Sequence, residues 1–286
     1  MDRDYTTISP SAKSLLVMKG LTNIPFAKQA AELLIKSEKY DPDTIKKDFT
    51  FWARVVHFEN RYWSINQLFN ELPTKNILEL SSGFSFRGLD MIKQDNIYYI
   101  DTDLPEMTEM KKNLITALQN GNINSRSKLE ILPLNALDEN QFANVVSHFP
   151  EGEIAIVNEG LLMYLNTGEK EKLCRIIYNV LKQRGGYWIT ADIYIKNQVD
   201  KLDLKLDDKT KFFFDQHNIE GNKFESFEAA ESFFNKNGLI IDKIAETDRS
   251  KLSALKYLKE SASFKELFKM RKGSKIQTTW RLRIKK

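Results

Sequence analysis

The sequence predicts an α/β fold in which a mostly parallel seven-stranded sheet has helices on both faces. From Ile77 onward, short apolar segments alternate with segments of helical length, and this order is typical of parallel sheets. A segment near the end of the chain alternates apolar and basic residues, as a half-exposed strand does, and we expect it to insert antiparallel. The strand candidates are 77–80, 97–100, 128–132, 154–157, 187–193, 239–245 and 278–284.

The first 72 residues show helical spacing of apolar side chains and no strand alternation, as in Phe26, Ala30 and Leu33. We therefore expect an N-terminal helical cap over residues 1–72, followed by one core domain over 73–286. Insertions in this core are expected near 196–224 and 248–275. A chain of 286 residues with 42% hydrophobic content is long enough for one such domain.

Helix boundaries support this order of elements. Pro105 suits the first turn of a helix after the second strand, and Asn166 followed by Glu169 forms a capping pattern before a long apolar-periodic segment. Ser226 is expected to begin a further helix. Between the first two strands, residues 84–93 are expected to form a helix of about three turns.

Composition limits the class of protein. Lys and Arg total 43 against 39 Asp and Glu, and the charges are interspersed along the chain, so we expect no nucleic-acid partner. The single cysteine, Cys174, lies in an apolar-periodic segment and is expected to be a buried small hydrophobe. The lack of an apolar run near 18 residues predicts no membrane partner, and together these features predict a cytoplasmic protein.

The stretch from Asn76 to Gly88, NILELSSGFSFRG, suggests an enzyme that binds a nucleoside-sized cofactor. A glycine loop after the first strand and a carboxylate after the second are the groups that a bound ribose needs at this edge of a sheet. Only Gly83 and Gly88 are present, with bulky Phe84, Phe86 and Arg87 between them. Such a loop accommodates a pyrophosphate poorly but can pass beside the amino-acid end of S-adenosylmethionine.

Six segments resemble the leucine carboxyl methyltransferase family, which also includes bacterial O-methyltransferases similar to those of polyketide pathways. The most specific are D-L-P at 103–105 and E-G-L-L-M-Y-L at 159–165, and the resemblance covers about residues 11–193. One departure is that many members have glycine where this chain has Ser81 or Ser82. The segments are ILELSSGFSFRG, YYIDTDLPEM, PLNALDENQF, IAIVNEGLLMYL, FWARVVHF and SAKSLLVMKG.

This resemblance implies a Rossmann-like, class I methyltransferase that moves a methyl group from S-adenosylmethionine to an oxygen of a small molecule. It selects Asp103, rather than Asp101, as the ribose-binding carboxylate. It also implies that Arg54 binds the cofactor carboxylate, with two parallel hydrogen bonds available from a guanidinium. Lys13 occupies a comparable basic position near the start, and Glu159 is expected to contact the cofactor.

The same resemblance places Asn135 and Ala136 at the edge of the adenine, although a plain β-turn beginning at Asn135 also explains that segment. Gly83 is expected to let the backbone approach the methionine portion, or simply to form a tight turn. Glu79 lies inside an apolar strand. It either organises the glycine loop and receives the cofactor's ammonium group through water, or is a buried acid with a backbone or basic partner.

The catalytic residues are less defined. Tyr164 suits a wall beside the substrate or the sulfonium, since an aromatic face attracts cations, but it suits core packing almost as well. His57 is a weak candidate for a general base with a hydroxyl acceptor, whereas a carboxylate acceptor is already ionised and needs none. The three histidines, His57, His148 and His217, show no metal-ligand spacing.

Three alternatives remain open at this point. Protein C-terminal carboxyl methylation belongs to the same family, but an apolar pocket under an aromatic cap favours a small-molecule acceptor. A nicotinamide-dependent oxidoreductase would share the ribose carboxylate but would need more glycines in the loop. A non-catalytic protein that binds S-adenosylmethionine would keep the fold without the reaction.

Overall fold

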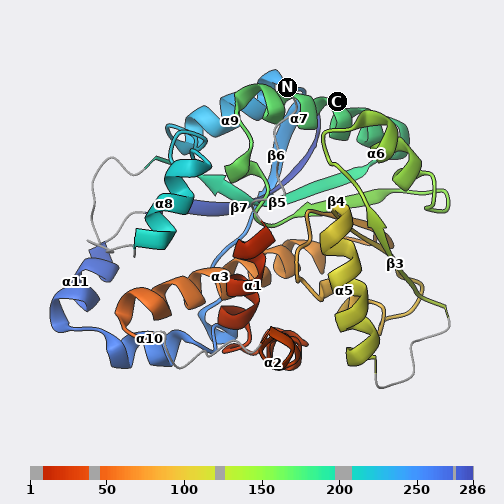
Figure 1. Cartoon of the computed structure of the whole chain (residues 1–286). Helices are drawn as coiled ribbons and strands as arrows, with labels where there is room; N and C mark the ends of the chain where they lie inside the picture. The colour runs from red at the N-terminus through yellow and green to blue at the C-terminus, as the bar shows by residue number, and fades with distance from the viewer. Residues whose placement is uncertain (1–8, 39–45, 120–125, 197–207, 273–274, 286) are drawn as a thin grey trace.

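The computed structural model describes residues 9–38, 46–119, 126–196, 208–272 and 275–285. A seven-stranded sheet crosses the molecule in the strand order β3-β2-β1-β4-β5-β7-β6 (Figure 1). Residues 197–207, in the first expected insertion, and 273–274, in the second, lie outside the described ranges. No described helix is both long and apolar enough to cross a membrane.

All seven segments predicted to be strands are strands. β1 to β5 run parallel, while β7 pairs antiparallel with both β5 and β6, as predicted. Parallel pairing places the carboxyl ends of β1, β2 and β4 at the same edge. The strands are β1 (Asn76–Leu80), β2 (Tyr98–Asp103), β3 (Lys128–Pro133), β4 (Ile154–Asn158), β5 (Gly186–Tyr194), β6 (Leu239–Ile244) and β7 (Gln277–Ile284).

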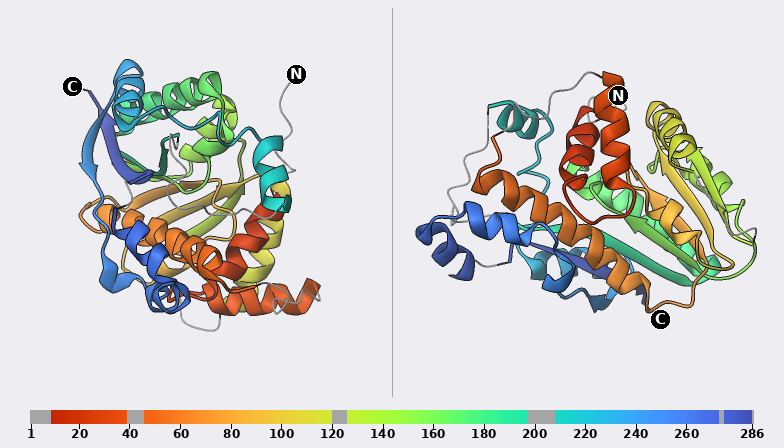
Figure 2. Two further views of the ribbon diagram at one scale, coloured as in Figure 1. Left: turned by 90° about the vertical axis from the view of Figure 1, so that its left-hand side faces the viewer. Right: turned by 90° about the horizontal axis from the view of Figure 1, so that it is seen from below.

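Helices cover both faces of this sheet (Figure 1). One face carries α6 (Glu139–Val146), α7 (Thr167–Arg184) and α9 (Phe227–Lys236). The other carries α1 (Ser9–Lys19), α2 (Ala27–Glu38), α3 (Phe49–Phe69), α4 (Arg87–Met91) and α5 (Pro105–Leu118). Figure 2 (right) shows α1 beside α3, with α2 packed against α1. The other helices are α8 (Asp208–Gln216), α10 (Leu255–Ser261) and α11 (Phe264–Lys272).

The alternation of side chains along β1 divides the core in two. Leu78 and Leu80 pack in the cluster that contains α6, α7 and α9, whereas Ile77 packs in the cluster that contains α2, α3 and α5. Glu79 shares the side of Ile77, so its carboxylate is directed toward the face that α3 and α4 cover. This placement decides which partners Glu79 can reach.

The predicted helix starts are confirmed. Pro105 occupies the first turn of α5, and Asn166 and Glu169 form a reciprocal capping box at the start of α7. Ser226 accepts a hydrogen bond from the Ala229 N–H at the start of α9. Cys174 is buried in α7, where burial raises the pKa of its thiol, so it is an inert core side chain.

The predicted helix over residues 84–93 is much shorter in the structure. α4 spans only Arg87–Met91, because the chain first makes a turn in which the Ser85 N–H donates to the Ser82 carbonyl. The side chains of Phe84 and Phe86 are buried around this turn. Burial of these two aromatic rings therefore overrides the helical tendency of the segment.

Glu59 of α3 fixes the segment that leads into α10. It is fully buried and accepts hydrogen bonds from the Ser253 N–H at 2.9 Å, the Ala254 N–H at 3.0 Å and the Ser253 hydroxyl. The bond from the buried Ala254 N–H satisfies a donor that would otherwise be costly to bury, whereas the Ser253 N–H also donates to the Lys251 carbonyl at 3.1 Å. Glu59 thus joins the C-terminal insertion to the helical layer that carries Arg54 and His57.

We predict that Glu59→Ala lowers the free energy of unfolding by about 2 kcal/mol, because three hydrogen bonds are lost and the buried Ala254 N–H is left without its acceptor. Urea denaturation measures this loss, and hydrogen exchange at Ser253 and Ala254 should accelerate. The matched control is Glu260→Ala, since Glu260 is exposed on α10 and should change stability by less than about 0.5 kcal/mol. Equal stability of the two variants would contradict the role of Glu59 in fixing the segment before α10.

Candidate functional site

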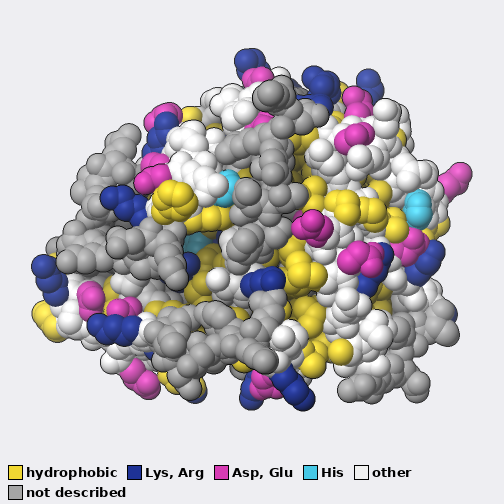
Figure 3. Space-filling view, in the orientation of Figure 1, with side chains coloured by type: hydrophobic (Ala, Val, Ile, Leu, Met, Phe, Trp, Pro, Cys, Tyr) yellow, Lys and Arg dark blue, Asp and Glu magenta, His cyan; other side chains and the backbone are white. Residues whose placement is uncertain are grey.

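The candidate site lies where β1, β2 and β4 end. The 81–83 loop follows β1, Asp103 ends β2, and Glu159 follows β4, so the register of the three strands brings these segments to one edge of the sheet. On the face shown in Figure 3, hydrophobic side chains gather in the middle of the molecule, where α1 and α5 lie in Figure 1. This edge is where open α/β sheets bind their ligands.

Asp103 holds the glycine loop. One carboxylate oxygen accepts from the Gly83 N–H at 2.7 Å and the other from the Leu104 N–H at 2.8 Å. Burial raises the pKa of Asp103, and these two hydrogen bonds oppose the rise. Asp101 is fully buried instead, and its carboxylate lies 2.7 Å from the Lys111 ammonium. Of the two carboxylates, Asp103 is therefore the one with access to the edge.

The loop between β1 and α4 has an unusual backbone. Gly83 adopts φ +51°, and Ser81 adopts φ +48°, a region that side chains other than glycine rarely occupy. Ser81 is one of the two positions at which many members of the resembled family have glycine. Such strain often accompanies functional loops, because the surrounding structure must hold the residue there.

Arg87 is the buried cation beneath the site. Its guanidinium contacts Glu79 at 3.5 Å and Glu159 at 3.1 Å, and it also donates to the Tyr62 carbonyl and the Asn66 side chain. Its side chain is 2% exposed. The Tyr99 hydroxyl donates to the second oxygen of Glu79 at 2.7 Å. Glu79 is thus a buried acid with a basic partner, one of the two interpretations that its sequence allowed.

Glu159 lies between two cations. Its oxygens are 2.7 Å from the Lys19 ammonium and 3.1 Å from the Arg87 guanidinium. Burial alone would raise the pKa of Glu159, but the charges of Lys19, Arg61 and Arg87 outweigh it and hold the pKa at about 2. Glu159 is therefore ionised at every physiological pH and offers a receptor for a cation.

A second buried ion pair fixes the segment that carries Glu159. Asp192 of β5 lies 3.0 Å from Arg61 of α3. It also accepts hydrogen bonds from the backbone N–H groups of Gly160, Leu161 and Leu162, at 2.7, 2.6 and 3.1 Å. The Asp192 carboxylate therefore fixes the backbone of the turn after β4.

His57 belongs to the same network. Its Nε2 lies 2.6 Å from the Tyr194 hydroxyl, and Arg61 donates to that hydroxyl at 3.1 Å. Burial, aided by the positive charge of Arg61, lowers the pKa of His57 from 6.5 to about 3. A histidine with so low a pKa is neutral at pH 7 and is a weak general base.

Tyr164 is buried after β4. Its ring makes edge contacts with Phe213 of α8, at 6.2 Å between centroids, and with His217 at 6.0 Å. Asn222 ties this aromatic group in place, because its side chain donates to the Met163 and His217 carbonyls. Tyr164 therefore connects the turn after β4 with the described part of the insertion near 196–224.

The remaining predicted residues occupy separate elements. Lys13 lies on α1 and Arg54 on α3, both half-buried. Asn135 follows β3 and begins a turn in which the Asp138 N–H donates to the Asn135 carbonyl at 2.8 Å, as the β-turn alternative requires. Ala136 is buried beside it. The turn after β3 lies at the same edge as Asp103, since the Leu134 N–H donates to the Asp103 carbonyl.

Sequence reasoning missed Lys19, Arg61, Arg87 and Asp192. Arg87 was noted only as a bulky residue of the loop, and Arg61 and Lys19 were not considered. The one available signal was Asp192, an acid inside the apolar strand segment YWITADI, where an unpaired charge would be costly. Its arginine partner could not be identified, because α3 and β5 are far apart in the chain.

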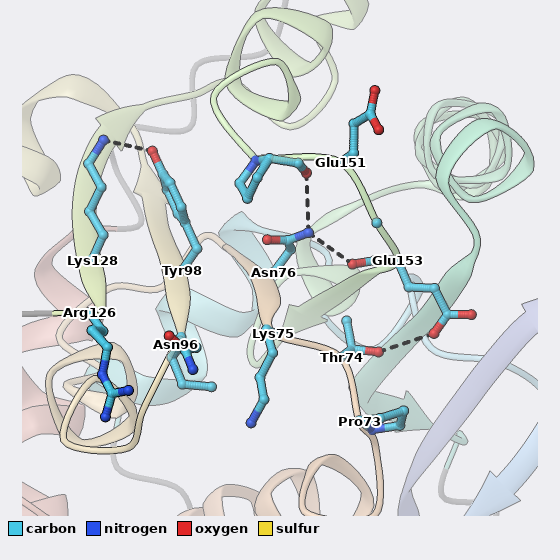
Figure 4. Close-up of a pocket in the computed structure, with 13 residues that line it drawn as sticks. Pro73, Thr74, Lys75, Asn76, Asn96, Tyr98, Arg126, Lys128, Glu151 and Glu153 are labelled. Carbon is cyan, nitrogen blue, oxygen red and sulfur yellow. Dashed lines mark hydrogen bonds between the residues drawn. The ribbon is translucent and has the colours of Figure 1, made fainter.

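A pocket of about 600 Å³ opens at the opposite edge of the sheet. Figure 4 shows its lining at the start of β1, β2 and β3, where Asn76 donates to the Pro150 and Glu153 carbonyls. Its lining includes the basic residues Lys75, Arg126 and Lys128 and the acidic residue Glu153. Because β1 and β2 begin here and end at the candidate site, this pocket is separate from Asp103 and Glu159.

The strand order with an antiparallel β7 defines the Rossmann-like, class I methyltransferase fold. Among solved structures, the chain is similar to a duf574 family protein from Streptomyces avermitilis, with 13% identity, a TM-score of 0.54, and coverage of 96% of this chain and 97% of that one. It is also similar to the mitomycin 7-O-methyltransferase MmcR, with 14% identity, a TM-score of 0.47, and coverage of 91% and 69%.

A pericyclic reaction enzyme also matches, with 11% identity and a TM-score of 0.45 over 74% of this chain. The chain spans only 44% of the length of that enzyme. No family model and no curated protein sequence matches the chain. The predicted kinship with the leucine carboxyl methyltransferase family therefore rests on its motifs and stays a prediction.

We predict that Arg87→Lys lowers the free energy of unfolding by about 3 kcal/mol, because one ammonium cannot pair with Glu79 and Glu159 and at the same time donate to the Tyr62 carbonyl and the Asn66 side chain. Urea denaturation checks this. Arg175→Lys, at an exposed position of α7, is the control and should change stability little. A loss below about 1 kcal/mol for Arg87→Lys would show that the bridge is dispensable.

We also predict a pH effect from His57. Its pKa is lower in the folded chain than in the unfolded chain, so the unfolded state binds more protons between pH 6.5 and about 3. Stability should fall with acidification through this range, by at most about 1.4 kcal/mol per pH unit from this residue. His57→Gln should remove this contribution, and His148→Gln, at the surface, should keep it. Parallel stability curves for wild type and His57→Gln would contradict the assignment.

Proposed function

We propose that the protein is an S-adenosylmethionine-dependent O-methyltransferase acting on a small molecule. The observation that carries the proposal is Asp103, which ends β2 and holds the Gly83 loop within a class I methyltransferase fold. A carboxylate in this position can accept hydrogen bonds from both ribose hydroxyls. The motif resemblance to the leucine carboxyl methyltransferase family supports the same function.

The other contacts follow from the chemistry of the cofactor. Arg54 and Lys13 are proposed to bind its carboxylate, and Glu159, which is ionised and buried, to bind its ammonium group. Asn135 and Ala136 are proposed to border the adenine. We assign Glu79 the role of holding Arg87, not of direct contact, because its side chain is fully buried and both its oxygens are held by the buried side chains of Arg87 and Tyr99.

The residues favour a carboxylate acceptor over a hydroxyl. Methyl transfer forms a bond from an acceptor oxygen to the methyl carbon while the bond from carbon to sulfur breaks, and S-adenosylhomocysteine leaves. A carboxylate is ionised near pH 7 and needs no base, whereas a hydroxyl needs one, and His57 is a weak base. The protein then contributes alignment and the exclusion of water.

A nicotinamide-dependent oxidoreductase is the second candidate, since it would also use Asp103. The loop argues against it, because α4 has only five residues and Phe84 and Phe86 are buried beside it. A pyrophosphate is normally bound by closely spaced glycines at the start of a longer helix. Within the first proposal, the C-terminal carboxylate of a protein is the alternative acceptor.

We predict that Asp103→Ala weakens S-adenosylmethionine binding at least tenfold, because about 1.4 kcal/mol of hydrogen bonding to a charged group is lost. Calorimetry with S-adenosylmethionine, S-adenosylhomocysteine and NAD tests both candidates. Asp95→Ala, near the opposite edge of the sheet, is the control and should bind normally. Unchanged affinity in folded Asp103→Ala would exclude Asp103, and NAD binding alone would exclude the methyltransferase.

The acceptor requires a separate experiment. Incubating the protein with S-adenosylmethionine and metabolite pools, with detection of methylated products by mass spectrometry, should yield a methyl ester. Formation of S-adenosylhomocysteine in step with that product would establish turnover. If the cofactor binds but no pool or peptide carboxyl terminus yields a methylated product, the chain is a binding protein.

A further inference from the structure

The Lys19 ammonium contacts the Glu159 oxygen that the ammonium group of a bound amino-acid ligand would also need. Its ammonium lies 2.7 Å from one Glu159 oxygen, while Arg87 holds the other oxygen at 3.1 Å. The side chains of Lys19 and Glu159 are 13% and 6% exposed. Both oxygens of this carboxylate therefore already have a cationic partner.

The two cations are not equally fixed. Arg87 is 2% exposed and has further partners in Glu79, Tyr62 and Asn66, so it is held from several sides. Lys19 is the last residue of α1, and its ammonium donates to the Glu159 carboxylate. Its four-carbon stem can turn toward solvent without moving the helix. Lys19 is thus the partner that can leave.

We propose that Lys19 is a built-in competitor for the cofactor's α-ammonium group, which must displace it from Glu159 before S-adenosylmethionine binds fully. This inference rests on the proposed function, because it takes Glu159 as the ammonium receptor. Both groups are primary ammonium ions with the same donors, so either can satisfy the same oxygen.

Charge balance supports the exchange. Arg87 and Lys19 together neutralise Glu79 and Glu159, two cations against two carboxylates. A third cation beside Glu159 would leave an excess positive charge in a buried place, which is unfavourable. The arriving ammonium and Lys19 therefore replace one another.

The competition has a consequence for ligand selectivity. Ligands with an amino-acid end, S-adenosylmethionine and S-adenosylhomocysteine, must displace Lys19, whereas 5′-methylthioadenosine has the nucleoside but no ammonium and need not. Removing the Lys19 charge should help only the first class. This contrast within one protein separates competition at Glu159 from a general change in the site.

The test is calorimetry on wild type and Lys19→Met with S-adenosylmethionine, S-adenosylhomocysteine and 5′-methylthioadenosine. We expect the first two to bind about fivefold to tenfold more tightly to the variant, a gain of about 1 to 1.4 kcal/mol, and the third to bind unchanged. Lys19→Arg, which keeps the charge, should restore wild-type affinity. The control is Lys112→Met, because Lys112 has an ion pair of equal length, 2.7 Å, with Glu109 on the exposed side of α5.

A thermal readout checks that the variant acts through the ligand site. Lys19→Met should lower the melting temperature of the free protein, since Glu159 loses a partner, and should increase the shift that saturating S-adenosylmethionine produces. Weaker S-adenosylmethionine binding in Lys19→Met would make Lys19 a cofactor contact and overturn the competition. An equal change for all three ligands would overturn it as well. If wild type and variants bind none of the three, the proposed function itself fails.

Discussion

The salt bridges of Arg87 hold together the parts that form the candidate site. This one side chain joins Glu79 on β1, the backbone and Asn66 side chain of α3, and Glu159 after β4. A buried guanidinium needs such partners, because removing a charge from water without them is costly. The buried carboxylates need a cationic partner for the same reason. The contacts of Arg87 therefore fix Glu79, Glu159 and α3 relative to one another.

A second buried ion pair, on the neighbouring strand β5, also joins the sheet to α3. Asp192 and Arg61 hold the turn after β4 from β5 and α3, and Tyr194 extends the network to His57. The helical layer before β1 is therefore attached to the sheet by charged contacts at the site and by apolar packing elsewhere. The position of this layer over the sheet therefore depends on both kinds of contact.

The two networks also explain the acid–base character of the site. The positive charges of Lys19, Arg61 and Arg87 hold the pKa of Glu159 at about 2, and burial, aided by the charge of Arg61, lowers the pKa of His57 to about 3, so neither group changes its charge near pH 7. A site of this kind is suited to chemistry that depends on alignment and fixed charge, as methyl transfer to an ionised oxygen does. It is poorly suited to chemistry that needs a proton acceptor at neutral pH.

The sequence by itself determined the seven strands, the antiparallel position of β7, and the caps at Pro105 and Asn166, because these depend on local periodicity and local hydrogen bonds. It also placed Asp103 and Gly83 at one edge, since parallel strands end together. Tertiary structure alone decided the length of α4, where buried Phe84 and Phe86 outweigh helix propensity, and the partners of Glu79, Glu159 and Asp192. The cationic partners come from α1, α3 and α4, and long-range ion pairs leave no periodic trace in a sequence.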